Sequence, residues 1–447
     1  MKPGSAGDRS RGQSIHTEGF GAGATPMTSS HDALYRAICA QPDEDTPRLV
    51  FADLVEENGD PLRARFIRTQ VALARLPAYD PAWVNARQHE PDSSTGHCMV
   101  QTLPQQLPDG VGWHRFEFRR GFPWKVGVRA LNALVPSGDT LFAAAPIQAL
   151  DFDPRSRPDL VALAEWPQLA RLRKLEFSAG WFPALDVARL AESEYAAGLT
   201  ELGFEGEAVA PDGLRALADS SLLVRLTGLE LRSIQVASAL LVDALGAAHE
   251  PGALSRLALP FNRLGRDDAE HLFRLPLLGD LQHLDVSNNP LGSGGVTALA
   301  ESGVVRGLRV LNLSKTKPGV PGVKALAEAG GLAGLRALDL SDNLLGPVAV
   351  KALAGCGGLR GLRVLNLSNN LVGDAGAAAL AAARSLSGLL ELDLRDADVG
   401  DAGAVALAES PYLDGLLRLD LGSRDSGSLG RAARAALVER FGNNVSL

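Results

Sequence analysis

The hydrophobic positions repeat with a nearly constant period over the C-terminal two thirds of the chain. Eleven segments of the form L-x-x-L-x-L, or near variants of it, start 25, 27, 27, 28 and then six times 27 residues apart. Their first residues are Ile147, Leu172, Leu199, Leu226, Leu254, Leu281, Leu308, Leu335, Leu362, Leu389 and Leu416. A fixed period of this length indicates a solenoid, in which each repeat packs only against its neighbours.

Each repeat has two halves with different hydrophobic periods. The block that begins at Leu362 shows them most clearly and reads LRVLNLSNNLVGDAGAAALAAA. In its first half, Leu362, Leu365 and Leu367 alternate with polar positions, as in a short strand with one buried face. In its second half, Ala377 and Leu380 recur at helical spacing. One strand and one helix per repeat, all in one direction, predict a parallel sheet with helices on its outer surface.

A polar position follows the strand. An inward asparagine there can bond the backbone groups left free where the chain leaves the strand. The position holds Asn262, Asn289, Asn343 and Asn370, with Thr316 between Asn289 and Asn343, and Gly180, Glu207 and Ile234 in earlier repeats. We therefore predict a structural turn role for the four asparagines, and a less regular solenoid before Leu254.

A glycine lies three positions beyond the asparagine. Glycine suits a sharp entry into a helix, where φ can be positive. The residues are Gly265, Gly292, Gly319, Gly346, Gly373 and Gly400. Asp374 and Asp401 come next in two repeats, and we expect each of them to cap its own helix.

These residues resemble the leucine-rich repeat, and the period of 27 with a DAGAxALA-like helical half resembles the ribonuclease-inhibitor-like subclass. The resemblance implies a horseshoe with a parallel sheet on its concave side and helices outside. We assign residues 146–427 to this solenoid. In residues 428–447, the residues on one helical face predict a C-terminal cap: Leu429, Ala432, Ala436, Leu437 and Phe441.

The N-terminal part lacks the repeat. Residues 1–29 have no apolar core of a secretory signal and are expected to be disordered, with Met27 as an alternative start. Residues 30–79 predict a small all-α module. Its first helix runs from Ser30, the second follows an N-cap at Thr46, and the third starts after Pro61. We expect buried faces formed by Leu49, Val50, Leu54 and Val55 in the second helix, and by Phe66, Ile67, Val71 and Leu73 in the third.

The string ALYRAICAQPDEDTPRLVFADLVEENGDPLRARFIRTQVAL in this module resembles the repeat-companion domain of planctomycete-type bacteria. That domain commonly precedes leucine-rich repeats, and it implies no activity. The matching residues are Pro42, Asp43, Asp45, Pro47, Arg48, Leu49, Ala52, Asp53, Glu56, Gly59, Asp60, Pro61, Arg65, Phe66, Ile67 and Gln70. Leu54 and Val55 depart from the family, which more often has Trp-Leu.

Residues 80–145 form a connector that concentrates aromatic and basic residues in the stretch WHRFEFRRGFPWKVGV. Basic residues interleaved with aromatics can bind single-stranded nucleic acid by stacking and charge. A strand pair that caps the open end of the solenoid explains the stretch equally directly. We favour the cap, because the formal net charge of −8 shows no basic footprint for nucleic acid.

Chemistry-bearing motifs are scarce. The sequence has no G-x-x-x-x-G-K-[ST], H-E-x-x-H, C-x-x-C or G-x-S-x-G motif, so we expect no enzyme and no cofactor. The group His89, His97, Cys98 and His114 matches no common zinc spacing, which favours a polar loop and no metal. Asp53, Glu56 and Glu57 could act as paired carboxylates, but the solvated face of a helix explains them more simply.

Cysteine usage and hydropathy bear on the compartment. Three scattered cysteines, Cys39, Cys98 and Cys356, argue against a disulfide framework and for a reducing compartment. No apolar run approaches the ~18 residues that span a bilayer. We therefore expect a cytoplasmic protein that does not bind a membrane.

The fifth strand position alternates with the buried leucines and should point out of the concave sheet. It holds Glu176, Gly203, Glu230, Ala258, Asp285, Asn312, Asp339, Asn366, Asp393 and Asp420. Six carboxylates in ten places favour a basic protein partner. The residues we expect to bind it are Glu230, Asp285, Asp339, Asp393 and Asp420. Alternatively, the column is an ordinary exposed strand face, partly neutralised by Arg309, Arg336 and Arg363 at the second position.

The functional prediction is therefore non-catalytic protein binding on the concave face, since solenoids present extended concave surfaces to their partners. Two alternatives belong to other classes. One is a GTPase-activating or other regulatory protein, because leucine-rich activators of GTPases use the same repeat subclass; it needs an exposed catalytic Arg or Asn that the sequence does not single out. The other is a structural spacer with no stable partner.

Overall fold

A computed structural model of the chain describes residues 29–77, 79–83, 107–113, 117–154, 156, 158–178, 180–248, 252–422 and 429–447. The other residues lie outside this description. They include nearly all of the N-terminal segment expected to be disordered, Met27, and the four residues of the histidine and cysteine group.

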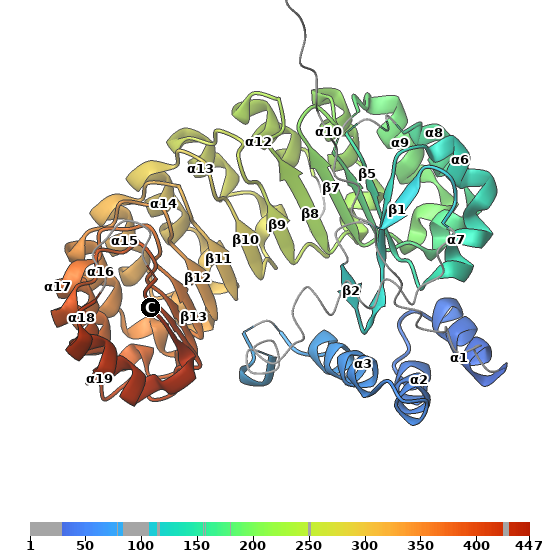
Figure 1. Ribbon diagram of the computed structural model, residues 1–447. Coiled ribbons are helices and arrows are strands. Elements are labelled where there is room, and N and C mark those ends of the chain that lie inside the picture. Colours follow the sequence, from blue (N-terminus) through green and yellow to red (C-terminus); the bar gives the residue numbers. More distant parts are fainter. Residues whose placement is uncertain are drawn as a thin grey trace, which may run out of the picture.

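One long sheet runs through the whole molecule and curves into a horseshoe (Figure 1). Within the described residues it has 14 strands in the order β1-β4-β5 and then consecutively to β16. All neighbours pair in parallel except β1 and β4. The strands, with the separate pair β2 and β3, are β1 (Val111–Trp113), β2 (Phe118–Arg119), β3 (Phe122–Pro123), β4 (Lys125–Val128), β5 (Ala149–Phe152), β6 (Lys174–Phe177), β7 (Glu201–Glu205), β8 (Gly228–Arg232), β9 (Arg256–Ala258), β10 (His283–Asp285), β11 (Val310–Asn312), β12 (Ala337–Asp339), β13 (Val364–Asn366), β14 (Glu391–Asp393), β15 (Arg418–Asp420) and β16 (Val445–Ser446).

Helices cover the convex side of the sheet, and three further helices lie beside its N-terminal end (Figure 1). The α-helices are α1 (Ser29–Ala40), α2 (Thr46–Glu57), α3 (Pro61–Ala74), α6 (Leu131–Leu134), α7 (Gly138–Ala144), α8 (Leu160–Ala164), α9 (Ala184–Glu192), α10 (Pro211–Ala218), α11 (Ser221–Arg225), α12 (Ser238–Gly246), α13 (Arg266–Leu272), α14 (Gly292–Glu301), α15 (Gly319–Glu328), α16 (Pro347–Ala354), α17 (Gly373–Ala381), α18 (Asp401–Ala408) and α19 (Arg431–Phe441). Short 3-10 helices include η3 (Glu194–Gly198), η6 (Leu332–Gly334), η7 (Gly357–Gly361) and η8 (Arg384–Leu386). The predicted fold class, an α/β solenoid with a parallel concave sheet after a small helical module, is confirmed.

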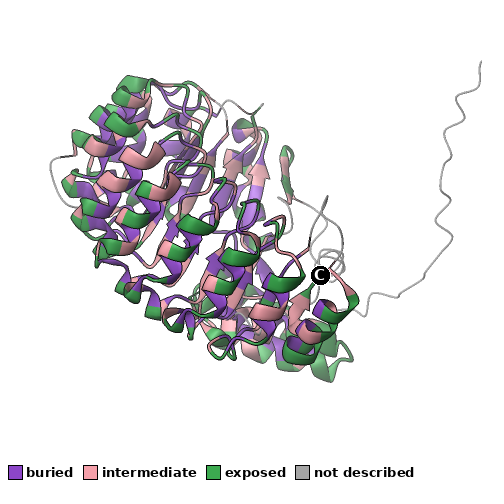
Figure 2. Ribbon diagram, turned by 90° about the vertical axis from the view of Figure 1, so that its left-hand side faces the viewer, coloured by how far each residue is buried: buried purple, intermediate pink, exposed green. Residues whose placement is uncertain are grey.

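Leucine columns form the core between sheet and helices. In the block at Leu362, for example, Leu362, Leu365 and Leu367 are fully buried, as are Ala377 and Leu380 of α17. Buried residues run along the inside of the whole solenoid, whereas exposed ones lie on the outer faces of the helices (Figure 2). Because each layer packs on the next, the core is continuous from β4 to α19.

The asparagines after the strands are buried and bonded to backbone groups. Asn289 is fully buried, and its amide donates to the carbonyls of Leu259 at 2.8 Å, Val286 at 2.9 Å and Ser287 at 3.1 Å. Its oxygen accepts from the backbone N–H of Asn262 and of Leu264 in the preceding repeat. Asn262, Asn343 and Asn370 make equivalent bonds. These side chains therefore tie each turn to the one before it.

The turns differ from prediction at glycine and aspartate. Positive φ occurs at Gly292, Gly319 and Gly373, but the other three glycines of the column are not in this region. Asp374 lies in the first turn of α17 rather than at its N-cap. Its Oδ1 accepts from the N–H groups of Gly400 and Gly403, which begin the next helix. Asp401 likewise accepts from the N–H of Gly430 before α19. The prediction of self-capping was wrong, because stacking brings the neighbouring helix terminus within reach of each aspartate.

The helical module also departs from prediction in α2. The helix begins at Thr46 itself, after Asp45. Its buried residues are Arg48, Phe51, Ala52 and Val55, whereas Val50 is 46% exposed. The buried face turned out differently because a part of the connector packs on α2, which the helical period alone could not show. In α3, the predicted Phe66, Ile67, Val71 and Leu73 are all buried.

The connector supplies that contact through β2 and β3. Phe122 of β3 is 1% exposed, and its ring packs against Phe51 at 5.6 Å and Tyr35 at 6.0 Å between centroids. Phe118 of β2 packs edge to face against Phe66 of α3 at 5.3 Å. Phe122 is thus part of the core of the module and is not available for stacking on nucleic acid bases, and half-buried Phe118 already packs on Phe66.

The sheet extends beyond residues 146–427 in both directions. At its N-terminal end, β4 pairs in parallel with β5, and β1 adds an antiparallel edge. At the other end, β16 pairs with β15 after α19. Ala433, Leu437 and Phe441 are the buried residues of α19, whereas Ala432, predicted to be buried, is exposed.

Candidate functional site

The concave face carries the predicted column in register. Glu176, Gly203, Glu230, Ala258, Asp285 and the following members pair strand to strand as far as Asp420. Glu230, Asp285, Asp339 and Asp393 are partly exposed, as expected for side chains that point out of the sheet. The column nevertheless divides into two parts with different chemistry.

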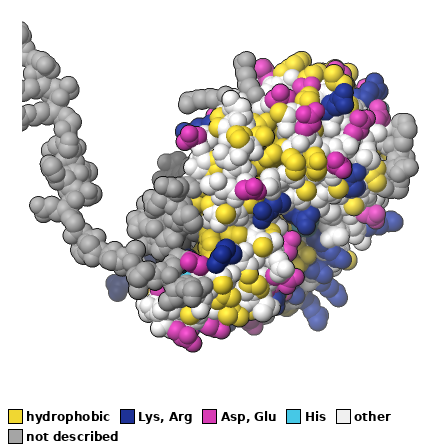
Figure 3. Space-filling model, turned by 90° about the vertical axis from the view of Figure 1, so that its right-hand side faces the viewer, with side chains coloured by type: hydrophobic (Ala, Val, Ile, Leu, Met, Phe, Trp, Pro, Cys, Tyr) yellow, Lys and Arg dark blue, Asp and Glu magenta, His cyan; other side chains and the backbone are white. Residues whose placement is uncertain are grey.

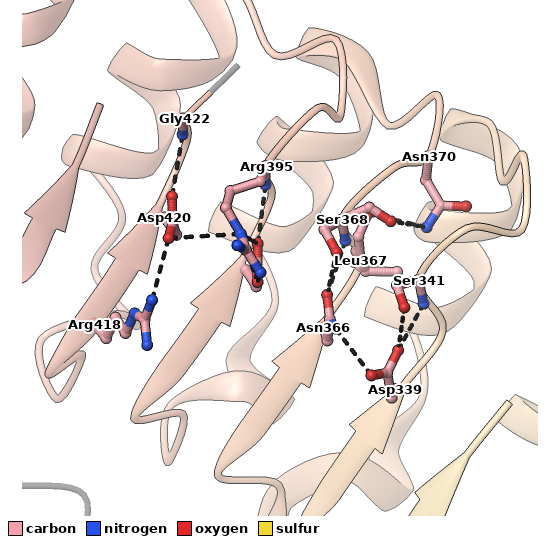
Figure 4. Close-up of polar contacts among 11 residues, drawn as sticks. Asp339, Ser341, Asn366, Leu367, Ser368, Asn370, Arg395, Arg418, Asp420 and Gly422 are labelled. Carbon is pink, nitrogen blue, oxygen red and sulfur yellow. Dashed lines mark hydrogen bonds and ion pairs between the residues drawn. The ribbon is translucent and has the colours of Figure 1, made fainter. Parts of the chain in front are cut away.

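In the C-terminal half, aspartates and asparagines bond to each other. Asn312 Nδ2 donates to Asp285 Oδ2 at 3.0 Å, and Asn366 Nδ2 donates to Asp339 Oδ2 at 2.9 Å. The other carboxylate oxygen of Asp339 accepts from the N–H and hydroxyl of Ser341 (Figure 4). The acids here therefore stabilise the strand ends, and their charge reversal would break these bonds.

Arginine side chains pair with Asp393 and Asp420, and Figure 4 shows the two arginines at Asp420. Asp393 pairs with Arg395 at 2.5 Å. Asp420 is only 5% exposed, and its carboxylate lies 3.6 Å from Arg395 and 3.3 Å from Arg418. The expectation that Asp420 is an accessible partner contact was wrong, because the end of the sheet buries it under two arginine side chains.

The second-position arginines do not neutralise the column. Arg309, Arg336 and Arg363 donate instead to the carbonyls of Gly334, Gly361 and Gly388 at 3.0, 3.3 and 2.6 Å. Each of these carbonyls lies in or near the 3-10 helix that ends the arginine's own repeat, just before the next strand. Each arginine thus satisfies the end of the helical half of its own repeat.

In the N-terminal half, lysine and arginine pair with the acids. Lys125 is 6% exposed and lies 2.5 Å from Glu176 Oε2. Burial disfavours its charge, but the hydrogen bond and charge of Glu176 outweigh this, so the pKa of Lys125 is raised. Lys174 also pairs with Glu176, and Arg256 lies 2.6 Å from Glu201. Most charges of this half are therefore already compensated.

Glu230 is the exception. Within the described part of the chain it makes no hydrogen bond and no ion pair. Burial raises its pKa, nearby Lys174 opposes the shift, and the charge of Glu176 adds to it. A carboxylate that has lost part of its hydration and has no hydrogen bond or ion pair of its own gains from pairing with an incoming cation.

Small residues leave space on both sides of Glu230. Its cross-strand neighbours in the column are Gly203 on β7 and Ala258 on β9. A hollow on one side is lined by Asp151, Glu176, Phe177, Ser178, Gly203, Phe204, Glu205, Glu230 and Arg232. The adjoining hollow is lined by Glu230 together with Lys174, Glu201, Gly228, Arg256, Ala258, His283, Asp285, Val310, Asn312 and the strand leucines Leu202, Leu229, Leu257 and Leu284. Glu230 thus stands between two depressions in the concave face.

Sequence reasoning missed these depressions. It followed the acids of the fifth position and left the third position out, although both point to the same face. The third position contributes Gly228 and His283, and burial beside Arg256 lowers the pKa of His283. The signal was present in the sequence, since Gly203, Gly228 and Ala258 are small residues at outward positions of three successive strands.

The surface carboxylates of the module are explained by local pairing. Asp53 and Glu56 both contact Arg68, at 2.6 and 2.7 Å, on the exposed side of α2 and α3. In the space-filling view of the N-terminal end, acidic and basic side chains both reach the surface among hydrophobic ones (Figure 3).

Over the part of the chain that the structure describes, no three His, Cys, Asp or Glu side chains gather as metal ligands. None of the described helices has the length and hydropathy needed to cross a membrane.

Comparison with known proteins gives matches to segments of the repeat. A family model described as Leucine Rich repeat matches residues 280–300, 335–354, 360–381 and 389–408. None of the curated proteins matches the chain. A crystal structure of an internalin from Listeria monocytogenes is 16% identical, covers 67% of this chain and 72% of that chain, and gives a TM-score of 0.40. A crystal structure of the Rad7 and Elc1 complex in yeast gives 16% identity, coverage of 67% and 77%, and a TM-score of 0.46.

Proposed function

We propose that this chain, built of leucine-rich repeats, binds a protein partner non-catalytically on its concave face, with a basic side chain of the partner paired to Glu230. The observation that carries the proposal is that the carboxylate of Glu230 lies between two hollows without a hydrogen bond or ion pair among the described residues. A Lys or Arg side chain can enter either hollow and form the ion pair that the chain itself does not supply. Contacts that desolvate a charged pair in a well-filled pocket dominate many interfaces.

The surroundings of Glu230 support a protein rather than a small ligand. On the C-terminal side of the hollows, Val310, Ala337 and Val364 form a half-buried apolar strip at the third strand position. This strip lies beside the bonded aspartates and asparagines, whose polar atoms are largely satisfied within the chain. A charged anchor next to an extended apolar strip fits the surface of a folded or extended polypeptide.

The residues predicted from sequence contribute unequally to this surface. Glu230 is the proposed anchor, and Asp285 lines the same hollow. Asp339 and Asp393 would form its polar margin, and Asp420 is excluded by its burial. The ribonuclease-inhibitor-like subclass, the companion-domain resemblance of the helical module, its assignment as residues 30–79, and a cytoplasmic location remain predictions.

Glu230→Gln tests the anchor. We expect the variant to lose at least tenfold in affinity for the partner, because a hydrogen-bonded charge pair in a half-buried site contributes about 1.5–3 kcal/mol. Its melting temperature should stay the same or rise, because burial raises the pKa of Glu230 and the ionised form is disfavoured in the folded chain. The measurement is affinity capture from native lysate with the wild type and with Glu230→Gln. The partner that the wild type captures is then titrated against each of the two proteins to obtain its dissociation constant.

Glu205→Gln is the matched control. Glu205 lines the same hollow but already pairs with Arg232 at 3.4 Å. We expect its loss to change partner affinity less than threefold, as for exposed ion pairs. Equal recovery of the same partner by wild type and Glu230→Gln would refute the anchor, and recovery of no partner by wild type would favour the structural spacer.

A further inference from the structure

A second surface lies on the flank of the horseshoe, where the chain leaves the C-terminal ends of the strands. We call the residues just before and just after the asparagine position the rim. The backbone N–H groups of Lys315, Asp342 and Asn369 donate to carbonyls of the following repeat at 3.1, 3.0 and 2.8 Å. The rim therefore continues the ladder of the sheet, with repeats about 4.8 Å apart.

Two leucines lie at the position just after the asparagine. Leu344 is 73% exposed and Leu371 is 51% exposed, and they occupy the same position in consecutive repeats. Arg263, Pro290, Lys317 and Asp398 hold this position elsewhere, and Phe261, four repeats before Leu371, is a further exposed apolar residue of the rim. Val348, at the start of α16, is 60% exposed. Within the described residues nothing buries these side chains.

The backbone at Leu344 adds to the anomaly. Its φ is 55°, in the left-handed region that costs free energy for a residue with a bulky side chain. Lys317 and Asp398 adopt φ values of 58° and 55° at the same position, whereas Leu371 is not in this region, so polar residues accept the conformation that Leu344 has. A polar residue would serve the turn equally well, and the fold therefore gives no reason for an exposed leucine there.

Charges flank the leucines with opposite sign. The repeat before Leu344 presents Lys315 and Lys317, both exposed. The repeat after Leu371 presents Asp398, also exposed, together with Asp396. At the position after the asparagine, four successive repeats thus read basic, apolar, apolar, acidic, whereas at the position before it Asp342 lies 4.0 Å from Lys315. Such an order is complementary to its own reverse.

We propose that the rim is a self-association surface on which two copies of this chain pair about a two-fold axis passing between Leu344 and Leu371. An axis that lies in the interface and across the rim reverses the order of the repeats but keeps each residue on its own row. Leu344 of one copy then meets Leu371 of the other, and Lys317 meets Asp398 of the other copy. The same patch serves both copies, as in any isologous dimer.

The concave face stays open in this arrangement, because the rim lies beside the sheet rather than in front of it. The dimer is thus independent of partner binding at Glu230. The contacting patch spans only four repeats, so the dimer is expected to be weak, in the range of small transient interfaces.

Charge exchange tests the two-fold axis. Sedimentation velocity of the full chain should show a monomer–dimer equilibrium between about 1 µM and about 1 mM. Lys317→Asp and Asp398→Lys should each weaken the dimer about tenfold, since each places two like-charged pairs in the interface. The variant that carries both Lys317→Asp and Asp398→Lys should restore the wild-type dissociation constant of the dimer, because each pair again joins opposite charges.

Leu344→Lys combined with Leu371→Lys should abolish the dimer, and lysine is compatible with the turn because Lys317 adopts the same backbone. Leu240→Lys, at a leucine that is 50% exposed on α12, is the matched control and should leave it intact. A chain that stays monomeric throughout, a dimer unaffected by the two lysines, or no recovery in the double charge exchange would each overturn the proposal.

Discussion

Phe122→Ala is expected to detach the helical module from the solenoid while the leucine core stays folded. The ring of Phe122 is 1% exposed and contacts Tyr35 and Phe51, with the guanidinium of Arg48 5.4 Å from its centroid. Truncation of a buried Phe to Ala costs about 3–5 kcal/mol. The remaining ties are the edge-to-face pair of Phe66 and Phe118, ion pairs such as Arg120 with Asp45 at 3.5 Å, and hydrogen bonds such as Tyr35 Oη to the carbonyl of Ala144 at 2.6 Å.

Hydrogen exchange of the variant gives the measurement. Amides of α1 to α3 should exchange faster, whereas those of β10 to β14 should keep their protection. Trp181→Ala, at an aromatic residue that is 60% exposed, serves as the control. It should change neither the exchange of the α1 to α3 amides nor that of the β10 to β14 amides. Unchanged protection in the module would show that β2 and β3 do not hold it.

Asn289→Ala is expected to destabilise the solenoid by about 3 kcal/mol or more. The substitution removes a buried amide that satisfies five backbone groups, three carbonyls and two N–H groups. Each buried group left without a partner costs about 1–3 kcal/mol, and part of that is recovered where water enters. Urea denaturation should show the loss in the unfolding free energy.

Thr316→Ala is the matched control for this substitution. Thr316 occupies the same position one repeat later and is equally buried, but its hydroxyl donates only to the carbonyl of Leu313, at 2.7 Å, among the described residues. We expect a loss of about 1 kcal/mol. Equal losses at both positions would contradict the view that asparagine links neighbouring repeats.

The repeat architecture was predictable because its signal is periodic. One register of leucines fixes the buried face of every strand, and the parallel sheet from β5 to β15 follows from it. The asparagines were predictable for the same reason, since a buried amide at a fixed distance from each strand has one obvious use.

What escaped prediction depends on contacts between distant segments. The buried face of α2 is set by Phe122, which lies far along the sequence, and the partners of Asp374 and Asp401 belong to the next repeat. A helical period or a capping preference carries no information about such neighbours. The start of the sheet was also not predictable from the leucine repeat, because β4 pairs with β5 but does not carry the leucine pattern.

The candidate site shows the same limit. The sequence identified the outward acidic column, but a count of carboxylates could not tell bonded acids from free ones. Asp339 and Asp420 are satisfied within the chain, whereas Glu230 is not. That distinction needs the positions of Asn366, Arg395 and Arg418, and it moves the expected anchor toward the N-terminal half of the horseshoe.

Site-specific photo-crosslinking in the native cells tests the central claim most directly. A p-benzoylphenylalanine at Ala258 would place the reactive group in the hollow beside Glu230, and one at Ala375 would place it on the exposed side of α17. The account predicts an adduct with another protein from Ala258 that is lost on Glu230→Gln, and none from Ala375. Adducts from Ala375 alone, or an Ala258 adduct that Glu230→Gln leaves unchanged, would contradict it.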